Sequence, residues 1–311
     1  MIKISVIIAT YNRCESLNDV LDTLLLQERT IDFDYEILVA DNNSKDKTKE
    51  VIESYVPKFN GQLRYLFEPR QGKSFALNLG IKEAKGEIIA FTDDDVIVDK
   101  EWLLNIWKCF KNYNCDGIGG RILPLYPENT PKWLKDNEDI LNGPIVFYDY
   151  GENIQIYNKK YILPFVGANM SFRKDCFFEY GLFRIDLGPG LDSTMGDDTD
   201  FFRRLEKVGK KLFYCGNALI WHKVDKNRAS LKYIAKWNIA SGKYFVKNGD
   251  KNKKFKYYFG VPRYLFKDLS ITFLFLIANL FNRKKFLKYW NVFFIKLGSL
   301  LEFKKLDLCQ K

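Results

Sequence analysis

The sequence predicts an α/β fold built on a mostly parallel sheet with helices on both faces. Two observations support this prediction. Short apolar runs alternate with helical patterns over the first 95 residues, and strands separated by helical segments of this length form βαβ units. The chain has 311 residues, of which 47% are hydrophobic and 28% charged. This is enough to bury a full core in one large domain or two.

Each element follows from its local pattern, with strands expected at apolar runs and helices where apolar residues recur every three or four positions. The expected strands are 2–9, 35–40, 63–67 and 87–91, and the expected helices are 15–27, 46–55, 74–84 and 102–112. Residues 118–164 are rich in Gly, Pro, Asn and aromatic residues, so no regular structure is predicted there. The prediction ends with a helix at 197–208, a short strand pair around 211–221, and helices alone beyond residue 227.

Charge is distributed unevenly along the chain. Residues 223–311 contain 21 Lys and Arg against 5 Asp and Glu, a balance of +16, and because the whole chain carries +10, residues 1–222 carry −6. A basic tail of this kind suits nucleic acid, an anionic membrane surface or an acidic partner. Apolar residues interleave with the basic ones, which favours the membrane surface over nucleic acid.

Several classes of protein are disfavoured. The chain enters a strand pattern directly after Met1 without the features of a secretion signal, so we expect a cytoplasmic protein. No Gly-x-Gly-x-x-Gly sequence follows the first strand and no Walker sequence occurs, which argues against dinucleotide and P-loop sites. No Cys-x-x-Cys spacing occurs either, and we expect reduced, mostly buried thiols. The cysteines are Cys14, Cys109, Cys115, Cys176, Cys215 and Cys309.

Three consecutive carboxylates, Asp93, Asp94 and Asp95, follow the apolar run at 87–91. Adjacent like charges are unfavourable unless solvent, a basic residue or a metal neutralises them. An acidic turn in water is the simplest interpretation. However, ligands of open α/β sheets bind at the ends of strands, and hard oxygen ligands suit Mg²⁺ or Mn²⁺ that also holds a phosphate.

Polar side chains also end the first two strands. Thr10-Tyr11-Asn12-Arg13 follows the first, and Asp41-Asn42-Asn43-Ser44 follows the second. Each sequence alone suits a turn or a helix N-cap. Together they place polar groups on the same sheet edge as the acidic triplet, where Asp41 can accept a hydrogen bond from a nucleobase and Arg70 can contact base or phosphate.

These motifs in order, with Gly72-Lys73-Ser74-Phe75-Ala76-Leu77-Asn78-Leu79-Gly80 and the run from Gly86 to Asp95, resemble family 2 glycosyltransferases over roughly residues 1–225. The resemblance implies the GT-A fold and a nucleotide-sugar donor. Asp93 and Asp95 would form an Asp-x-Asp motif, with Asp95 the direct ligand of Mn²⁺ or Mg²⁺ and Asp94 serving the sugar or nucleotide. The other implied donor-site residues are Thr10, Tyr11, Asn12, Arg13, Asp41, Arg70 and Lys73.

Three further positions follow from the same resemblance. The segment Gly196–Leu205 is similar to the family's Glu-Asp segment, with Asp197 where Glu is more usual, so Asp198 falls on the catalytic base; Asp197 and Asp200 are rivals within one turn. These acids also suit a helix amino end without any catalysis. Asn169 would lie near the donor sugar. His222 would reach the metal or the diphosphate, or else pack in the core beside Trp221.

The tail contains two apolar stretches, 264–281 and 286–303, with basic residues beside them. Both are too short or too charged for a membrane span, which needs about 20 apolar residues. Interfacial helices that meet anionic head groups fit better, and a helical hairpin that packs on the catalytic domain is the alternative. We therefore expect a catalytic domain at 1–222, with a nucleotide-sugar half to about 115 and an acceptor half from 116, and a membrane-associating tail at 223–311.

The expected function is inverting, metal-dependent transfer of a sugar, with UDP-sugars favoured because Asp41 suits uracil. The expected acceptor is a saccharide or lipid-linked saccharide, and the expected location is the inner face of the cell membrane. The sequence leaves both a monomer and a homo-oligomer open. Two alternatives remain: an aspartate-based phosphohydrolase with Asp93 as nucleophile, and a non-catalytic membrane-binding protein.

Overall fold

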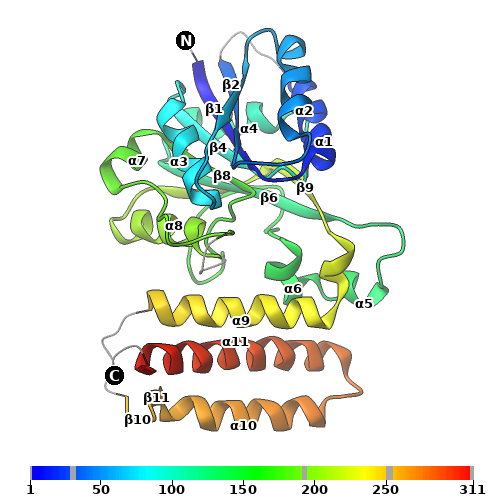
Figure 1. Ribbon diagram of the computed structural model, residues 1–311, viewed down its shortest axis with the longest axis vertical. Coiled ribbons are helices and arrows are strands. Elements are labelled where there is room, and N and C mark those ends of the chain that lie inside the picture. The colour runs from blue at the N-terminus through cyan, green and yellow to red at the C-terminus, as the bar shows by residue number, and fades with distance from the viewer. Residues whose placement is uncertain (1, 29–32, 191–194, 250–254, 309–311) are drawn as a thin grey trace. The chain divides into compact units, whose positions relative to one another are not determined.

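The computed structural model describes residues 2–28, 33–190, 195–249 and 255–308, which form two compact units (Figure 1). The first unit comprises the described residues of Met1–Leu125, Tyr148–Asp192 and Gly196–Lys223. The second comprises those of Tyr126–Phe147 and Val224–Lys311, together with Met195. Five cysteines are described and all are free, whereas Cys309 lies outside the described residues.

The first unit is built on one mixed sheet with the strand order β3-β2-β1-β4-β8-β6-β9-β5, and β7 pairs with β9. Parallel pairings join β1 to β2, β1 to β4, β2 to β3 and β6 to β9, and the remaining four pairings are antiparallel. The strands are β1 (Ile2–Thr10), β2 (Asp34–Asp41), β3 (Leu63–Phe67), β4 (Ile88–Thr92), β5 (Val96–Val98), β6 (Gly117–Leu125), β7 (Ile154–Ile156), β8 (Asn169–Arg173) and β9 (Leu212–Lys223).

Helices cover the amino-terminal strands on two sides. Figure 1 shows α1 and α2 on one side of β1 and β2 and α3 on the other. This follows from the strand order, because β1, β2 and β3 progress in one direction and the chain then returns to β4, and right-handed crossovers place the returning helix on the opposite face. The helices of this unit are α1 (Cys14–Leu25), α2 (Thr48–Tyr55), η1 (Val56–Phe59), α3 (Lys73–Glu83), α4 (Trp102–Tyr113), α7 (Asp175–Tyr180) and α8 (Asp197–Lys207).

Beyond residue 117 the structure differs from the sequence analysis in two places. Residues 118–164 contain regular structure, including most of β6, because its glycines serve close packing rather than turns: an added Cβ at Gly119 would lie 2.5 Å from the ring of Phe165. The expected strand pair around 211–221 is the single strand β9. Its register with β6 shifts between Gly120 and Arg121, so that Gly216-Asn217 forms an irregularity within one strand and not a turn between two.

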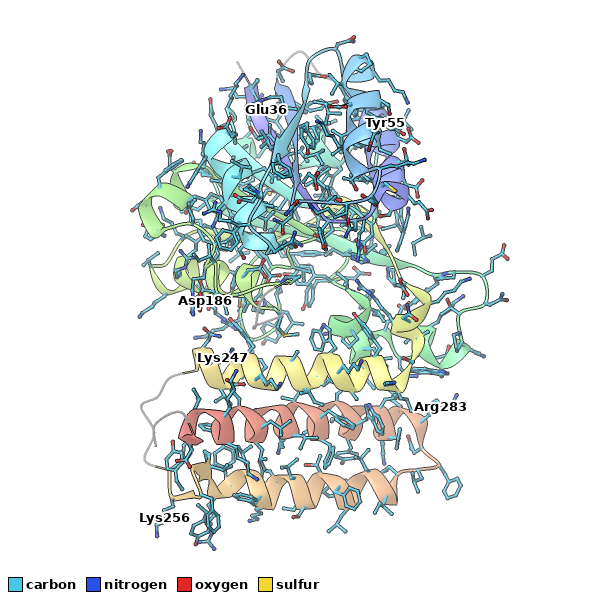
Figure 2. All side chains as sticks on the ribbon, viewed as in Figure 1. Glu36, Tyr55, Asp186, Lys247, Lys256 and Arg283 are labelled. Atoms are coloured by element: carbon cyan, nitrogen blue, oxygen red, sulfur yellow. The ribbon has the colours of Figure 1, made fainter. Side chains whose placement is uncertain are left out.

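The sheet also buries a charged side chain at its amino end, Glu36 of β2 (Figure 2). Its carboxylate accepts hydrogen bonds from Ser5 Oγ at 2.7 Å, the backbone N–H of Lys85 at 2.6 Å and Arg64 at 3.1 Å. A buried carboxylate is tolerated where such donors satisfy it. The network ties β1, β2, β3 and the segment before β4 together at this end of the sheet.

The second unit is helical. It contains α5 (Lys132–Lys135), α6 (Glu138–Ile145), η2 (Lys226–Ala229), α9 (Leu231–Asn248), α10 (Arg263–Ala278), α11 (Arg283–Leu308) and the short pair β10 (Tyr257–Tyr258) and β11 (Val261–Pro262). Helix α11 lies between α9 and α10 (Figure 1). The hydrophobic core of this second unit includes Leu134, Leu141, Ile145, Val224, Ile234 and Leu287. None of the described helices has the length and apolar character required to cross a membrane.

Two glycines set the distance between α9 and α11. An added Cβ at Gly242 of α9 would lie 1.9 Å from the carbonyl oxygen of Ile295, and one at Gly298 of α11 would lie 2.1 Å from that of Ile239. The two backbones therefore touch on both sides of the crossing. Any side chain here must push the helices apart.

We expect Gly298→Ala to lower the free energy of unfolding by about 1–3 kcal/mol. This sign is the reverse of the usual one, because Ala is normally better than Gly inside a helix by about 1 kcal/mol. Urea denaturation of the full chain measures it. Ser270→Ala on the exposed face of α10 is the control and should be neutral or slightly stabilising; a stabilised Gly298→Ala variant would contradict the close crossing.

Candidate active site

Three predicted site segments meet at the carboxyl ends of the parallel strands. In register, Thr10 of β1 pairs with Asp41 of β2, and Ile8 pairs with Thr92, the last residue of β4. Asp93 follows Thr92 directly. The structure therefore brings the polar ends of β1 and β2 and the acidic triplet to one edge of the sheet, as ligand sites of open α/β sheets require.

His222 completes a cluster with two of the acidic residues. It is buried in β9 opposite Val96 of β5, and its Nε2 lies 3.2 Å from Asp95 Oδ1 and 3.9 Å from Asp93 Oδ2. Its Nδ1 lies 3.0 Å from the carbonyl oxygen of Lys223. A carbonyl oxygen only accepts, so Nδ1 carries a proton, and in the neutral ring Nε2 presents a lone pair.

This geometry makes three candidate ligand atoms converge. His222 Nε2 faces carboxylate oxygens of Asp93 and Asp95, and the candidate ligand atoms of the three residues all lie within 4.8 Å of one another. Such an arrangement requires a proton on Nε2 or a cation between the groups. Imidazole and carboxylate ligands suit Mn²⁺, carboxylates suit Mg²⁺, and the hydrogen bond to Lys223 orients the ring as metal-bound histidines are usually oriented. The residues present therefore fit a divalent cation.

Arg13 and Thr10 bind the acidic triplet from the β1 side. Arg13 donates to Asp95 Oδ2 at 2.5 Å and to Asp94 Oδ1 at 3.3 Å, and Thr10 Oγ1 donates to Asp94 Oδ2 at 2.7 Å. Burial nevertheless raises the pKa of Asp94 to about 7, helped by the neighbouring carboxylates and only partly opposed by Arg13. Arg13 thus lies on the acidic side chains, whereas the resemblance assigned it to the donor.

Lys73, at the start of α3, links the triplet to the second acidic segment. Its ammonium group is paired with Asp93. Burial acts to lower the pKa of Lys73, but the charges of Asp93, Asp197 and Asp198 outweigh burial and raise it. Burial likewise favours a raised pKa for Asp93, yet Lys73 and His222 reverse the direction and lower it. Lys73 therefore stays charged between two groups of carboxylates.

The first turn of α8 contains the three candidate bases, and their surroundings differ. Asp198 is held by its neighbours: Oδ2 accepts from the N–H of Gly167 at 2.9 Å, and Oδ1 accepts from the N–H of Thr199 at 2.6 Å. Asp197 is buried, and burial with the charge of Asp198 raises its pKa to about 6. Asp200 pairs with Arg204 at 3.0 Å and with Arg184 at 3.5 Å.

The predicted nucleotide-side residues form a second group at the ends of β1, β2 and β3. Asp41 is buried and accepts from the N–H of Ser44 at 2.9 Å and from Tyr65 OH at 3.0 Å. Asn12 has a left-handed backbone with φ of 50° and accepts from the N–H of Lys45 at 2.7 Å, which joins the loops after β1 and β2. Tyr11 is about half exposed beside it.

Two predicted residues have other partners in the structure. Arg70 pairs with the buried Glu68 at 2.8 Å while most of its side chain faces solvent. Asn169 is buried: its carbonyl accepts from Trp102 Nε1 at 2.9 Å, and its amide group donates to the carbonyls of Arg121 and Ala218 at 2.9 and 2.8 Å. Both amide N–H groups of Asn169 are therefore used to join β8 to β6 and β9.

Sequence reasoning did not identify two contacts that hold the candidate site. Tyr65 donates to Asp41 from the neighbouring strand, and the backbone of Gly167 orients Asp198 from 31 positions away. Alternation within β3 could have placed Tyr65 on a face of the sheet, but nothing in the sequence pairs it with Asp41. A backbone N–H leaves no trace in residue type, so Gly167 could not have been found as a partner of Asp198.

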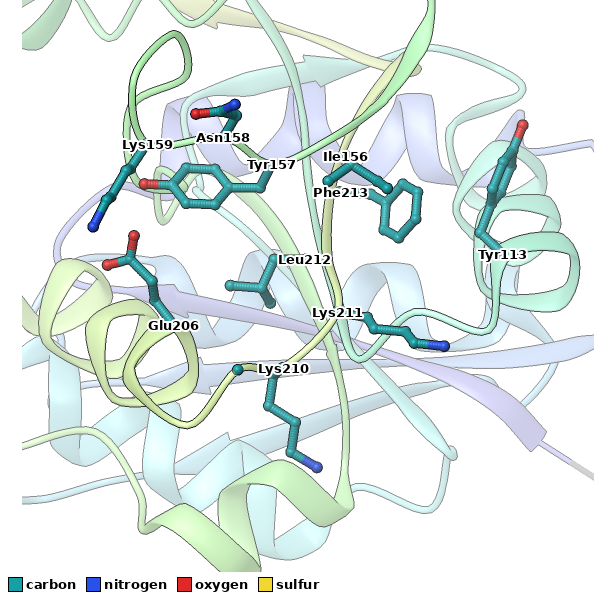
Figure 3. Close-up of a pocket in the computed structure, with 11 residues that line it drawn as sticks. Tyr113, Ile156, Tyr157, Asn158, Lys159, Glu206, Lys210, Lys211, Leu212 and Phe213 are labelled. Carbon is teal, nitrogen blue, oxygen red and sulfur yellow. The ribbon is translucent and has the colours of Figure 1, made fainter.

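A cavity of about 590 Å³ lies elsewhere on this unit (Figure 3). Tyr113, Tyr157, Lys211 and Phe213 are among its lining residues. Phe213 is the second residue of β9 and His222 is the second-last, so the cavity and the histidine lie near opposite ends of this strand. The cavity shares no residue with the candidate site.

A sequence model described as glycosyl transferase family 2 matches residues 5–181, more than half of the chain. The chain belongs to this family. The succinoglycan biosynthesis protein ExoM of Rhizobium meliloti is 25% identical over 207 residues, covering 66% of this chain and 62% of that protein. Glycosyltransferase AglE of Haloferax volcanii is 32% identical over 124 residues, covering 40% of each chain. This family 2 chain thus spans less than two thirds of both relatives.

Solved structures share its fold. The mannosyltransferase PcManGT of Pyrobaculum calidifontis, in complex with GDP-Man and Mn²⁺, superposes with a TM-score of 0.62 at 18% identity, covering 99% of this chain and 88% of that chain. TarS 1-349 of S. aureus, in complex with UDP, superposes with a TM-score of 0.55 at 14% identity, covering 99% and 91%. The predicted GT-A fold is confirmed for this family 2 chain.

Asp94→Asn should make the unfolding stability of the protein less sensitive to pH. In the folded protein the pKa of Asp94 is raised from its ordinary value of 3.8 to about 7. Between these two pH values the folded state binds more protons than the unfolded state, so the free energy of unfolding falls as the pH rises. The free energy of unfolding of the variant should therefore be about 1–3 kcal/mol higher than that of the unsubstituted protein at pH 8, and the two values should converge near pH 4.

Urea denaturation in chelator-treated buffer across pH 4–8 measures this difference. The exposed Asp175→Asn is the matched control and should leave the pH profile unchanged. Parallel profiles for Asp94→Asn and the unsubstituted protein would rule out a raised pKa at Asp94.

Proposed function

We propose that this chain is an inverting, divalent-cation-dependent glycosyltransferase that moves a sugar from a nucleotide sugar to a hydroxyl group of a saccharide or lipid-linked saccharide. The convergence of His222 Nε2 with the carboxylates of Asp93 and Asp95 is the observation that supports this best. With Nε2 unprotonated, the three groups face one another as acceptors, and a cation bound between them would stabilise the arrangement. Family membership supplies the reaction class.

In this proposal Asp93, Asp95 and His222 hold Mn²⁺ or Mg²⁺. The bound cation would neutralise the charge that develops on the departing nucleoside diphosphate. Thr10 keeps Asp94 in place, and Arg13 and Lys73, which contact the carboxylates in the structure, are positioned to contribute positive charge to the diphosphate.

Asp198 is the proposed base. A sugar hydroxyl is a weak nucleophile, and a carboxylate within hydrogen-bond reach takes its proton as it attacks the anomeric carbon. The backbone N–H of Gly167 and the N–H and hydroxyl of Thr199 donate hydrogen bonds that fix the carboxylate of Asp198. Direct displacement inverts the configuration at the anomeric carbon and needs no covalent intermediate. Asp200 is occupied by two arginines and Asp197 is buried, so both are less accessible to an acceptor hydroxyl.

Asp41 is the proposed contact for the nucleobase. Tyr65 and Ser44 hold its carboxylate at the end of β2, and a carboxylate can accept the imide N–H of uracil. UDP-sugars are therefore the favoured donors, with GDP- and dTDP-sugars as the alternatives. The proposed cellular setting is synthesis of a cell-surface polysaccharide or glycoconjugate, with an anionic membrane surface as a partner of the second unit.

Asp198→Asn should lower kcat by about 10²–10⁴-fold, while donor affinity stays within about twofold and thermal stability stays close to that of the unsubstituted protein. Asparagine keeps the shape of the side chain and cannot accept the proton. Steady-state transfer assays and donor calorimetry measure the two effects. Asp200→Asn, two residues further along the same helical turn, is the matched control and should retain most of the transfer rate. A larger loss of kcat in Asp200→Asn than in Asp198→Asn would reverse the assignment.

Asp95→Asn should weaken cation-dependent binding of the donor by at least about tenfold. The first step is a calorimetric screen of UDP-, GDP- and dTDP-sugars with Mn²⁺ and Mg²⁺, followed by Mn²⁺ electron paramagnetic resonance with the donor that binds. Exposed Asp175→Asn is the control. If no donor binds in the screen, or if Asp95→Asn binds Mn²⁺ and donor normally, the proposed site is wrong.

A further inference from the structure

Helix α10 exposes an unusual amount of apolar surface. Only Leu265, Thr272 and Leu276 of its residues are buried. Five apolar residues of α10 and the turn after it, which we call the outer face of α10, are between 40% and 105% exposed. They are Ile271, Leu274, Ile277, Leu280 and Phe281. A contiguous apolar surface of this kind marks an interaction site rather than a solvated helix.

The outer face points away from the rest of its unit. Leu274 lies two residues from both Thr272 and Leu276, and at about 100° per residue this places it on the opposite side of the helix. The inner side is held to α11 by an ion pair between Asp268 and Lys296 at 2.6 Å. Figure 2 shows side chains of α10 projecting away from α11.

Helix α11 differs from α10, although the sequence suggests the same role for both. Its aromatic residues pack within the unit: Tyr289 stacks on Phe275 with ring centroids 4.9 Å apart, and Trp290 lies 4.7 Å from Phe294. Between α9 and α10 most of its side chains are at least partly buried. Of the two apolar stretches in the tail, α10 alone presents a broad apolar face to solvent.

Positive charges flank the outer face at both ends. Lys256, Arg263 and Lys267 lie at the amino end of α10, and Arg283, Lys284 and Lys285 follow Phe281. All six are exposed, and Figure 2 labels Lys256 and Arg283 toward opposite ends of the helix. Asp268 is the single acidic residue in α10, and it is already paired with Lys296.

We propose that α10 and the turn after it dock on the surface of an anionic phospholipid bilayer. The helix would lie in the plane of the interface, with Leu274, Ile277 and Phe281 entering the boundary between head groups and acyl chains, and the flanking cations would meet anionic head groups. The 16 residues of α10 extend about 24 Å, which suits a helix lying along the surface. This inference rests on the membrane partner within the proposed function and assigns it to one face of one helix.

The charge around the outer face favours a bilayer over a second copy of the chain as its partner. Packing two outer faces together would bring the exposed cations of each copy close to those of the other. Among these cations only Lys284 has an acidic partner within the described residues, Asp139, and the one acidic residue of α10, Asp268, is already paired with Lys296. An anionic bilayer complements both the apolar centre and the basic ends.

Leu274→Glu in the full chain tests the proposal. It should weaken binding to vesicles of phosphatidylglycerol and phosphatidylcholine at least about tenfold, because a carboxylate cannot enter the acyl boundary and is repelled by anionic lipid. Leu26→Glu is a close match, since Leu26 is 70% exposed and Leu274 is 65% exposed, and Leu26 lies in the first unit. Leu26→Glu should bind as the unsubstituted protein does.

Vesicle flotation without any nucleotide sugar measures the binding, and thermal denaturation checks that both variants remain folded. Arg283→Gln combined with Lys285→Gln should weaken binding to the anionic vesicles by about tenfold or more, and vesicles of phosphatidylcholine alone should bind weakly. Equal binding by Leu274→Glu and Leu26→Glu overturns the proposal, and so does a dimer that depends on Leu274 without vesicle binding. Donor binding is assayed separately, so a failure of docking leaves the proposed reaction standing, and a failure of donor binding leaves docking standing.

Discussion

The candidate site depends on one electrostatic constraint: a buried histidine faces two carboxylates. The backbone carbonyl of Lys223 accepts a hydrogen bond from Nδ1 of His222, which directs Nε2 toward Asp93 and Asp95. The antiparallel pairing of β5 with β9 holds these groups together, since it places Val96 opposite His222. Arg13, just before α1, and Lys73, at the start of α3, then supply positive charge. The site is thus an electrostatic consequence of how five elements meet at one sheet edge.

Much of the fold could be predicted because the first half of the chain obeys local rules. Apolar runs and helical spacing located β1 to β4 and the helices between them within a few residues. The second half violates these rules for physical reasons. Gly119 makes room for Phe165 inside a strand, and Gly216 lies within an irregularity of β9 that resembles a turn. A glycine-rich segment has the same composition whether its glycines form a turn or allow a neighbouring side chain to pack against the backbone. Only the tertiary packing distinguishes the two cases.

The candidate site divides in the same way. Asp93, Asp95 and Asp41 could be located because residue type and strand-end position both point to polar chemistry there. The partners of those residues could not. Neither the pairing of Arg13 with the triplet nor the hydrogen bond of Gly167 to Asp198 depends on sequence proximity. Asn169 illustrates the opposite case. The sequence suggests a role near the donor sugar, whereas in the structure its amide group donates hydrogen bonds to backbone carbonyls of the neighbouring strands.

The glycine crossing of α9 and α11 has a consequence for how this chain can change over evolutionary time. At Gly242 and Gly298 the neighbouring backbone occupies the space of a side chain, so almost every substitution there is excluded regardless of what surrounds the protein. The outer face of α10 is constrained, if at all, only by its surroundings: in water it would drift freely toward polar residues. The persistence or loss of Leu274 and Phe281 among close relatives therefore records the environment that α10 meets, whereas the glycines record only the shape of the unit.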